Sequence, residues 1–439
     1  MERAMQKLLF FIENTVCGAF LPTALFISGA VLFVRLARYV FAPHFFFGKL
    51  KEKRRCGKSA FSSLWLALGG TLGVGNICGV AAAIYVGGAG CVFWIWVCAI
   101  LSSVTKYAET VLAVHFRKRD GSGSAYGGAH SYIESGLGAK KLSVIFCVLC
   151  IVTAFTMGNV TQVKAASDFA LTAFGIPRSV TSTVFFCAVL LLTIGRGNAI
   201  KAFTSRAVPL LCVLYTVCCL AVTVVYSENI AAVTHSIFTQ AFNPQAGISG
   251  FFAFLCSPAV RLGITRGVMS NEAGCGTAPI AYAADRDAEA VSSGLLGMIE
   301  VLVDTLLLCT LTAYALLLPG IPLSADSATS IISAFSHSLG AFIAPVMTVS
   351  VFLFALASVS AWSFYALESA KAIGAKKRFG CFFTALYSAT AFFGCLAPER
   401  LSWLLSDLTV SFMAIINLTA VMLLCDKVSG ITKSAYKTI

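Results

Sequence analysis

One stretch of this sequence has residue types suited to binding a small polar solute through its backbone: GGTLGVGN at Gly69–Asn76. Gly73 lets the chain leave helical geometry there. Amides that begin the next half-helix would point toward an anion with the help of the helix dipole, namely those of Val74, Gly75 and Asn76. Carbonyls that end the preceding half-helix suit a cation, namely those near Gly69, Thr71 and Leu72. A compact zwitterion beside a metal cation fits this arrangement.

A break of this kind leaves backbone groups without partners, so in hydrocarbon it is tolerated only where it is buried in protein or faces a polar ligand. A second polar interruption, RLGITRGVMSNEAGCGTAP, spans Arg261–Pro279. Close helix packing is the alternative interpretation of the first stretch, because Gly69 with Gly73 and Gly75 with Gly79 have GxxxG spacing. A dinucleotide-binding loop is disfavoured, since GVGNICG lacks the GxGxxG spacing and follows no strand.

The composition places both stretches in a membrane. The chain has 439 residues, 58% of them hydrophobic and 12% charged, with a mean hydropathy of +0.87. At ~20 apolar residues per crossing, it has room for ten or more transmembrane helices. This excludes a large soluble catalytic domain, a disordered scaffold and a secreted disulfide module, and a β-barrel would show short alternating segments instead. The 17 cysteines lie mostly in apolar stretches, where cysteine is a small buried hydrophobe. The predicted fold class is an all-α integral membrane protein.

The apolar segments predict a single domain of eleven helices. The first is an extra N-terminal helix, and the two interrupted segments open two groups of five helices, 60–226 and 247–425, before a cytoplasmic tail at 426–439. Two such groups, with broken helices that start from opposite faces, form an inverted repeat whose breaks meet near the bilayer midplane. The predicted helices cover residues 17–40, 60–86, 90–114, 142–171, 179–195, 204–226, 247–284, 290–318, 339–372, 379–396 and 403–425.

The basic residues predict the orientation of the chain. With the loop 42–60 in the cytoplasm, cytoplasmic segments hold 22 Lys and Arg, and the opposite side holds four, Arg3, Lys7, Arg178 and Arg400. This positive-inside asymmetry accounts for most of the net charge of +13 without a nucleic-acid partner. We expect the N-terminus outside and the C-terminus in the cytoplasm.

Several segments resemble the alanine or glycine:cation symporter family, the sodium/alanine symporters. The match begins with GTLGVGNICGVAAAIYVGGAGCVFWIWVCAILSSVTKYAETVLAVHFR, which contains the first glycine-rich stretch. GGAHSYIESGLG (Gly127–Gly138) is similar to the family's GGPMYYI, MGNVTQ (Met157–Gln162) to its GN-x-x-Q, and RGVMSNEAGCGTAPIA (Arg266–Ala281) to its RGLFSNEAGxGSAPIA. GMIEVLVDTLLLCTLTA and SAWSFYALE continue the match, which extends from the first helix to about the tenth.

The resemblance implies a LeuT-like fold of the amino acid-polyamine-organocation superfamily, with a 5+5 inverted repeat preceded by one extra helix. It also implies residue roles. The amides of Val74 and Gly75 would bind the substrate carboxylate and the Thr71 carbonyl its ammonium. The implied substrate-binding set is Thr71, Gly73, Val74, Gly75, Asn76, Gln162, Met269 and Trp362, with Phe364 and Tyr365 as aromatic neighbours. Sodium would lie between the carbonyls of Gly69 and Leu72 and the hydroxyl of Ser358, an oxygen cage that suits a hard cation.

The sequence departs from the family pattern in three places. Val74 stands where the family usually has Thr or Ser, so one hydroxyl is missing from the first break. Met269 replaces a usual Phe and gives a softer wall. Ala357 and Ser358 stand where the family has a Ser-Thr pair. These departures bear on substrate and sodium affinity more than on the transporter class.

Charged residues inside the apolar segments are functional candidates by default, because a charge in a membrane helix is costly. Lys164 and Asp168 are four residues apart and predict an ion pair on one helix face; the alternative is that Lys164 supplies a positive charge that weakens the need for sodium. Glu300 and Asp304 have the same spacing. They could pair with Arg261, Arg266 or the broken backbone, or they could relay a proton or contact a cation. Lys106 with Glu109, and Glu272, are interpreted as residues that tie helix ends near the cytoplasmic face, with a gate as a further role.

These observations predict a sodium-coupled importer of small neutral amino acids, chiefly alanine of either hand or glycine, in the bacterial inner membrane. Its partners would be the amino acid, Na⁺ and the lipid bilayer, without nucleic acid and without a cofactor. The closest alternative is proton coupling through Glu300 or Asp304. An intramembrane enzyme is disfavoured because HExxH and GxSxG are absent from the sequence. A channel would lack the paired breaks or arrange them around a symmetric pore.

Overall fold

The computed structural model describes residues 20–55, 61–119, 123–242 and 258–438, together with the single residues Thr15 and Gly121. Within these ranges the regular structure is helical apart from one short antiparallel ribbon, in which β1 (Lys118–Arg119) pairs with β2 (Ala125–Tyr126). The predicted all-α membrane architecture is confirmed for the described residues.

Seven of the described helices are long and apolar enough to cross a membrane, and an eighth span results if the bent pair Ser62–Thr71 and Val74–Gly87 is counted as one. By length and composition, the protein therefore crosses the membrane many times. The long helices are α2 (Leu21–Val40), α6 (Gly90–His115), α8 with α9 (Lys140–Phe155, Thr161–Phe174), α11 (Arg196–Val225), α16 with α17 (Ala290–Val301, Thr310–Leu317), α19 (Ile343–Ala372) and α21 (Glu399–Leu423).

Two of these long helices contain a wide-turned π segment. The segment η4 (Thr156–Val160) joins α8 to α9, and η6 (Leu302–Cys309) joins α16 to α17. Such segments are rare inside α-helices and occur frequently at functional sites. Both carry residues that the site described below uses.

The remaining elements are shorter. They comprise α3 (Pro43–Arg55), α4 (Ser62–Thr71), η3 (Val74–Asn76), α5 (Cys78–Gly87), α7 (Ala129–Leu137), α10 (Arg178–Ile194), η5 (Ser227–Asn229), α12 (Ile230–Ala241), α14 (Pro258–Asn271), α15 (Ala278–Ala283), α18 (Ser327–Leu339), α20 (Lys377–Gly394) and α22 (Cys425–Tyr436).

Several boundaries differ from the sequence predictions. The helix predicted at 204–226 begins earlier, at Arg196, because the basic segment before residue 204 forms its first turns and not a loop. Helices α3, α7, α12, α18 and α22 occupy segments predicted as loops or tail; each is short or too polar for a membrane-length apolar signal. Residues 17–19 and 247–257 of two predicted helices lie outside the described residues. The count of eleven membrane helices stays a prediction.

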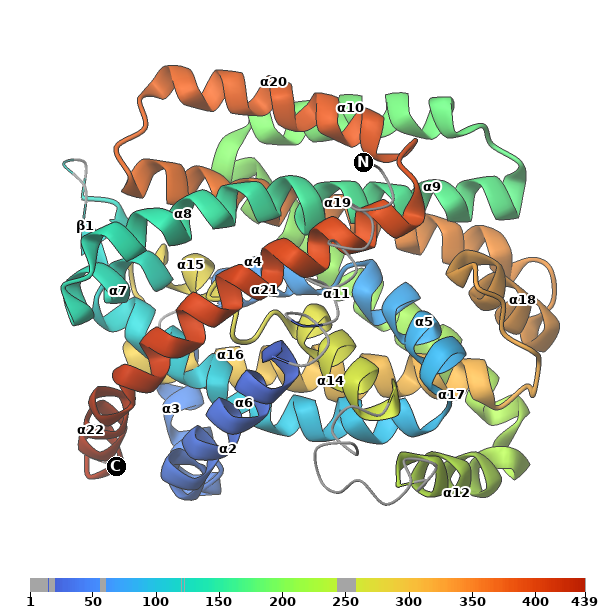
Figure 1. Ribbon diagram of the computed structural model, residues 1–439, viewed down its shortest axis with the longest axis horizontal. Helices are drawn as coiled ribbons and strands as arrows, with labels where there is room; N and C mark the ends of the chain where they lie inside the picture. The colour runs from blue at the N-terminus through green and yellow to red at the C-terminus, as the bar shows by residue number, and fades with distance from the viewer. Residues whose placement is uncertain are drawn as a thin grey trace.

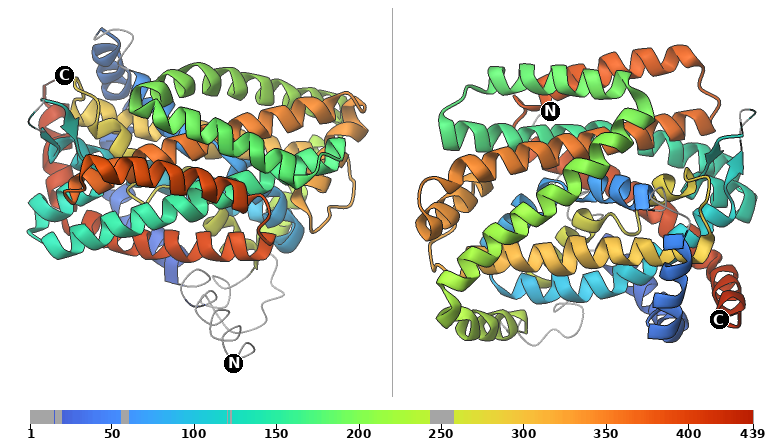
Figure 2. Two further views of the ribbon diagram at one scale, coloured as in Figure 1. Left: turned by 90° about the horizontal axis from the view of Figure 1, so that it is seen from above. Right: turned by 180° about the vertical axis from the view of Figure 1, so that it is seen from behind.

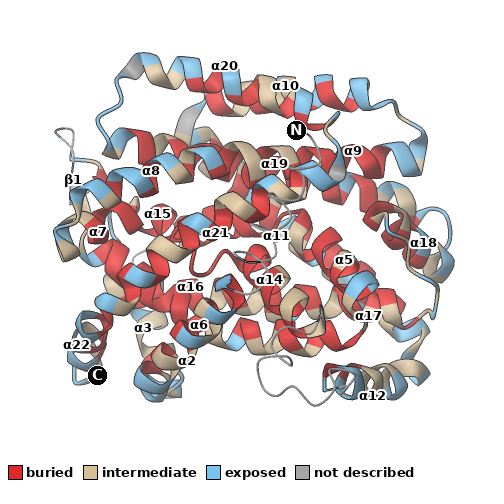
Figure 3. Cartoon of the chain, viewed as in Figure 1, coloured by how far each residue is buried: buried red, intermediate tan, exposed pale blue. Residues whose placement is uncertain are grey.

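The helices are stacked in layers. Helices α10 and α20 form a pair along one edge of the molecule, above α8, α9 and α19 (Figure 1), and the views of Figure 2 show the same pair as an outer layer. On the other side α6 packs against α14 and α16. Helix α21 crosses the front of the bundle diagonally. Buried residues are concentrated where these layers meet, and exposed ones lie on the outer helices (Figure 3).

The first predicted helix break is confirmed, and the second is confirmed in part, because residues 261–271 of the predicted interruption are helical. Helix α4 ends at Thr71, Gly73 is extended, and the chain turns by 56° before it continues through η3 into α5. Helix α14 ends at Asn271 and α15 begins at Ala278. Between them, Glu272 has a φ of 54°, the one positive φ of a non-glycine residue in the described chain. A conformation this unfavourable for an L-residue persists only where the surroundings enforce it, and such residues cluster at functional sites.

Candidate substrate and cation site

A single carboxylate joins the two breaks. Asp304 lies in η6 with no exposed surface. The Asn76 side-chain amide, from the first break, donates to Asp304 Oδ1 at 2.6 Å and to the Asp304 carbonyl at 2.9 Å. From the last turn of α14, the Ser270 hydroxyl donates to Asp304 Oδ2 at 2.7 Å, and Thr305 donates to the same oxygen at 2.8 Å. Asp304 therefore holds the two interrupted helices together inside the protein.

A small cavity of about 10 Å³ lies between the breaks. The structure brings five of the implied substrate residues to its wall: Thr71, Val74, Gly75, Gln162 and Met269. The other lining residues are Gly70, Met157, Thr161, Glu272 and Trp403. Of these, only Glu272 was given a role from the sequence, as a gate or structural charge. The Asn76 side chain turns to Asp304 instead, as described above.

Gln162 caps the first break. The Val74 amide, implied as a donor to the substrate carboxylate, donates to Gln162 Oε1 at 2.9 Å. Gln162 Nε2 in turn donates to the Met157 carbonyl at 3.3 Å. Gly73 makes room for this contact, because a Cβ there would lie 2.4 Å from Gln162 Oε1. The carboxamide oxygen thus occupies a position in which a carboxylate oxygen would accept the same bond.

Oxygen atoms also gather at the end of α4. The Ser358 hydroxyl of α19 donates to the Gly70 carbonyl at 2.9 Å, between Gly69 and Leu72, whose carbonyls were implied as sodium ligands. Gly69 itself packs against Thr204 of α11, where a Cβ would lie 2.9 Å from the Thr204 methyl. The Tyr365 hydroxyl also lies against Gly70 and has no hydrogen-bond partner among the described residues. One carbonyl and two neighbouring hydroxyls are the kind of oxygen ligands that a hard cation prefers.

Glu272 and Trp362 form the far wall of the second break. The Trp362 indole donates to Glu272 Oε1 at 2.9 Å, and the Thr277 hydroxyl donates to Oε2 at 2.7 Å. These bonds hold the left-handed residue Glu272 in place. Trp362 was implied as a pocket wall, but its indole is placed behind Glu272 and rests on Gly158 of η4.

The contact between Gly158 and Trp362 yields a testable prediction. A Cβ at position 158 would lie 2.4 Å from Trp362 Cγ, so Gly158→Ala must displace the indole from Glu272. We expect a loss of about 1–3 kcal/mol of stability, the usual cost of overpacking a dense interior, visible as a lower Tm of the purified protein in detergent. Gly380→Ala is the matched control, because a Cβ there meets nothing within 4 Å. Equal Tm values for the two variants would contradict the packing role.

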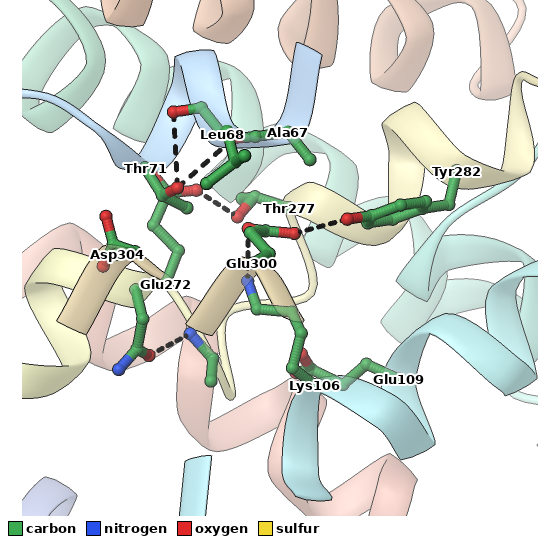
Figure 4. A network of polar contacts seen from close by, with 12 residues as sticks. Ala67, Leu68, Thr71, Lys106, Glu109, Glu272, Thr277, Tyr282, Glu300 and Asp304 are labelled. Atoms are coloured by element: carbon green, nitrogen blue, oxygen red, sulfur yellow. Dashed lines mark hydrogen bonds and ion pairs between the residues drawn. The ribbon is translucent and has the colours of Figure 1, made fainter. Parts of the chain in front are cut away.

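A buried charge network lies beside the second break (Figure 4). Lys106 Nζ is 3.4 Å from Glu300 Oε1, with no exposed side-chain surface on either residue, and the Tyr282 hydroxyl donates to Glu300 Oε2 at 2.8 Å. Glu109 accepts a hydrogen bond from the amide of Asn417 in α21. Lys106 and Glu109 were interpreted as ties at helix ends, but both are fully buried in the interior of α6, and they connect it to the helices that carry Glu300 and Asn417. Glu300 pairs with Lys106, not with Arg261 or Arg266.

Arg266 has a different partner. It lies over the Trp403 ring at 4.6 Å, 3.5 Å from Asp407 Oδ1, and donates to the Met269 sulfur at 3.1 Å. This Arg266–Asp407 contact joins α14 to α21 next to the cavity. The sequence reasoning missed Asp407 and Trp403; a charge inside the last apolar segment was the signal that could have found Asp407.

The predicted pair of Lys164 and Asp168 is present in α9, and Asp168 also accepts from Arg178 at 2.9 Å. Lys164 is thus neutralised by its own helix, which favours the structural interpretation.

At the opposite ends of the helices, a polar cavity of about 600 Å³ opens beside the first turn of α4 and the last turns of α19. We call it the polar vestibule; its charged lining residues are Lys201, Asp285, Arg286, Asp287, Glu368 and Lys371.

A bundle of membrane-length helices in which two discontinuous helices meet around a buried polar site is the construction of a secondary transporter. The comparison with known proteins is more specific. A family model described as the sodium:alanine symporter family matches residues 2–438, and the chain belongs to this family. It is accordingly a transporter and not an enzyme.

Curated relatives agree with this assignment. The chain is 32% identical to the sodium/alanine symporter AgcS of Methanococcus maripaludis, over 94% of this chain and 92% of that protein. It is 31% identical to the putative sodium/proton-dependent alanine carrier protein YrbD of Bacillus subtilis, over 86% of this chain and 80% of that protein. It is 29% identical to the probable sodium/glutamine symporter GlnT of the same organism, over 83% of this chain and 76% of that protein.

Proposed function

We propose that this protein imports small neutral amino acids, chiefly alanine or glycine, together with sodium. The observation that carries the proposal is the junction of the two breaks: residues at the ends of both interrupted helices line one cavity, together with Gln162, and Asp304 holds the breaks together. Family membership and the names of AgcS and YrbD support alanine and sodium as the transported pair.

The proposed architecture is a LeuT-like 5+5 inverted repeat formed by residues 60–226 and 247–425, after one extra helix. One interrupted helix in each group supports it. The excess of basic residues on one side supports a cytoplasmic C-terminus and an outer N-terminus in a bacterial inner membrane.

In the proposed binding step, the substrate carboxylate takes over the Val74 amide from Gln162 Oε1, and the freed carboxamide turns toward the substrate. The Thr71 carbonyl receives the ammonium. Sodium binds at the end of α4, to the carbonyls of Gly69 and Leu72 and the hydroxyl of Ser358; the hydrogen bond from Ser358 to the neighbouring Gly70 carbonyl supports this position.

Access to the site alternates between two sides. On the outer side of the proposed orientation, the Arg266–Asp407 contact and Trp403 close the cavity. On the cytoplasmic side, the polar vestibule leads inward along α4. A cavity of about 10 Å³ is too small for an amino acid, so the breaks must separate when substrate enters. Sodium and substrate would each favour the conformation that binds both better, and each would strengthen the binding of the other.

Proton coupling through Asp304 is the second candidate. The hydrogen bonds that reach its carboxylate come from an amide and two hydroxyls, all neutral groups, although it is fully buried between the breaks. Such a carboxylate could exchange a proton as the breaks move. The printed name of YrbD, sodium/proton-dependent, supports keeping this alternative.

One experiment separates the two candidates. Uptake of labelled alanine and glycine is measured in proteoliposomes with a sodium gradient, with potassium in place of sodium, and with potassium plus an imposed pH gradient. We expect uptake only with sodium. Uptake driven by the pH gradient in potassium would favour Asp304 as a proton site, and an absence of amino-acid uptake in all three conditions would contradict the proposed function.

A further inference from the structure

An open-sided apolar crevice of about 580 Å³ lies between the ends of α10, α11, α19 and α20, away from the site described above. Its volume is within the ~300–1,000 Å³ range of ligand-binding pockets. Its walls are mainly aliphatic and aromatic, with Leu190, Ile194, Ile200, Phe364, Leu367 and Phe379 among the lining side chains.

The crevice belongs to the lipid-facing layer of the protein. Helices α10 and α20 form the outer pair of Figure 1, and large apolar side chains on both are exposed. Leu191 of α10 is 71% exposed and Phe382 of α20 is 65% exposed. An apolar cavity does not hold water well, whereas the surrounding bilayer supplies hydrocarbon chains. An acyl chain therefore fits the lining.

The rim of the crevice is basic. Lys371, in the last turn of α19, and Lys376, just before α20, both line it and are exposed. Glu368 is the one acidic residue among its lining side chains. The rim lies where α19 ends and α20 begins, which we infer to be near a membrane–water boundary, and the Lys371 ammonium lies there 5.0 Å over the Tyr126 ring. Lysine there attracts the phosphate of an anionic lipid through its compact charge.

We propose that the crevice is a binding site for an anionic phospholipid. One acyl chain lies between α10 and α20, and the lipid phosphate binds Lys371 and Lys376. The crevice shares Phe364, Gly197, Glu368 and Lys371 with the polar vestibule, so the bound lipid stands directly behind the Phe364 wall of that vestibule. Lys201 lies 5.5 Å over the Phe364 ring on the vestibule side.

The test measures lipid retention and needs no transport activity. The full-length protein is equilibrated in mixed micelles with equal amounts of phosphatidylglycerol and phosphatidylethanolamine, repurified, and its retained lipids are quantified by native mass spectrometry. We expect phosphatidylglycerol to be enriched. The enrichment should fall about fivefold for each lysine neutralised in Lys371→Gln and Lys376→Gln, the effect of about one charge near an anionic lipid.

Two further variants make the result specific. Gly380→Leu adds a side chain at a residue that lines the crevice, where a Cβ meets nothing within 4 Å, and should reduce the retention of both lipids. Lys140→Gln with Lys141→Gln removes two exposed charges at the start of α8, outside the crevice lining, and should leave the enrichment unchanged. Enrichment that survives both rim substitutions, or retention that Gly380→Leu does not alter, would overturn the proposal.

Discussion

Asp304→Ala is expected to lower amino-acid uptake by at least about 100-fold. The substitution removes the carboxylate that accepts from Asn76 and Ser270, which come from the two different breaks, and it leaves Asn76 only its bond to the Asp304 carbonyl. Each buried donor left without a partner costs about 1–3 kcal/mol, and about 1.4 kcal/mol corresponds to a factor of ten in rate. Uptake into proteoliposomes, normalised to the inserted protein, measures the effect.

Asp304→Asn separates the two roles that this carboxylate could have. Asparagine keeps an oxygen that can accept from Asn76 but loses the negative charge. If Asp304 only joins the breaks, Asp304→Asn should retain much of the uptake and its dependence on sodium. If the charge itself binds an ion or a proton, the variant should lose the coupling as well. Asp426→Asn is the control, since that carboxylate is 91% exposed in its pair with Arg35. Full uptake by Asp304→Ala would contradict the role of this residue at the junction.

Lys106→Met is expected to produce the largest loss of stability. Lys106 is the ammonium that faces the buried carboxylates of Glu300 and Glu109. Removing one partner of a buried ion pair leaves an uncompensated charge and costs about 3–5 kcal/mol. Thermal unfolding in detergent, followed by the loss of monodisperse protein, measures this change.

A compensating variant tests the cause of that loss. Lys106→Met combined with Glu300→Gln removes the charge on both sides, so it should recover part of the lost stability, and a double-mutant cycle gives the coupling. Lys118→Met is the control, because Lys118 and Glu134 form a half-exposed pair, which typically contributes about 0–1 kcal/mol. A double variant as unstable as the sum of its single variants would show that Lys106 and Glu300 act independently.

Local sequence signals predicted the parts of the site that depend on local chemistry. The glycines at 73 and 75 marked the first break, and the polar run that contains Glu272 marked the second. The four-residue spacing of Lys164 and Asp168 predicted their ion pair. These features follow from backbone geometry or helix periodicity within a few residues, which a single sequence displays.

The partners of buried polar groups could not be predicted in the same way. Arg266 and Asp407 are 141 residues apart in the sequence. Which carboxylate pairs with a given Lys or Arg side chain depends on how the helices pack. Glu300 and Asp304 share a helix face by their spacing, yet one binds Lys106 and the other Asn76. Sequence periodicity restricts the direction of a side chain but not the identity of the helix opposite.

Amphipathic helices were the main part of the fold that the hydropathy pattern did not reveal. Helices α12, α18 and α22 have 12 or 13 residues each, below the length of a membrane span. Their polar faces resemble loops when the search is for continuous apolar runs. Interactions with the bundle identify them instead, as where Thr432 of α22 meets the hydroxyl of Tyr107 at 2.9 Å.

The π segments η4 and η6 have a consequence for how this chain can change over time. Each residue added to an α-helix rotates the next side chain by about 100°, and a wide turn absorbs one extra residue without altering the helix beyond it. Deleting one residue within 156–160 would therefore let that segment close into an ordinary α-helix while Gln162 kept its direction toward Val74, and a deletion within 302–309 would likewise leave the far end of that span unrotated. At these two places the chain would thus tolerate the loss of a residue, and the side chains that face the cargo would keep their directions.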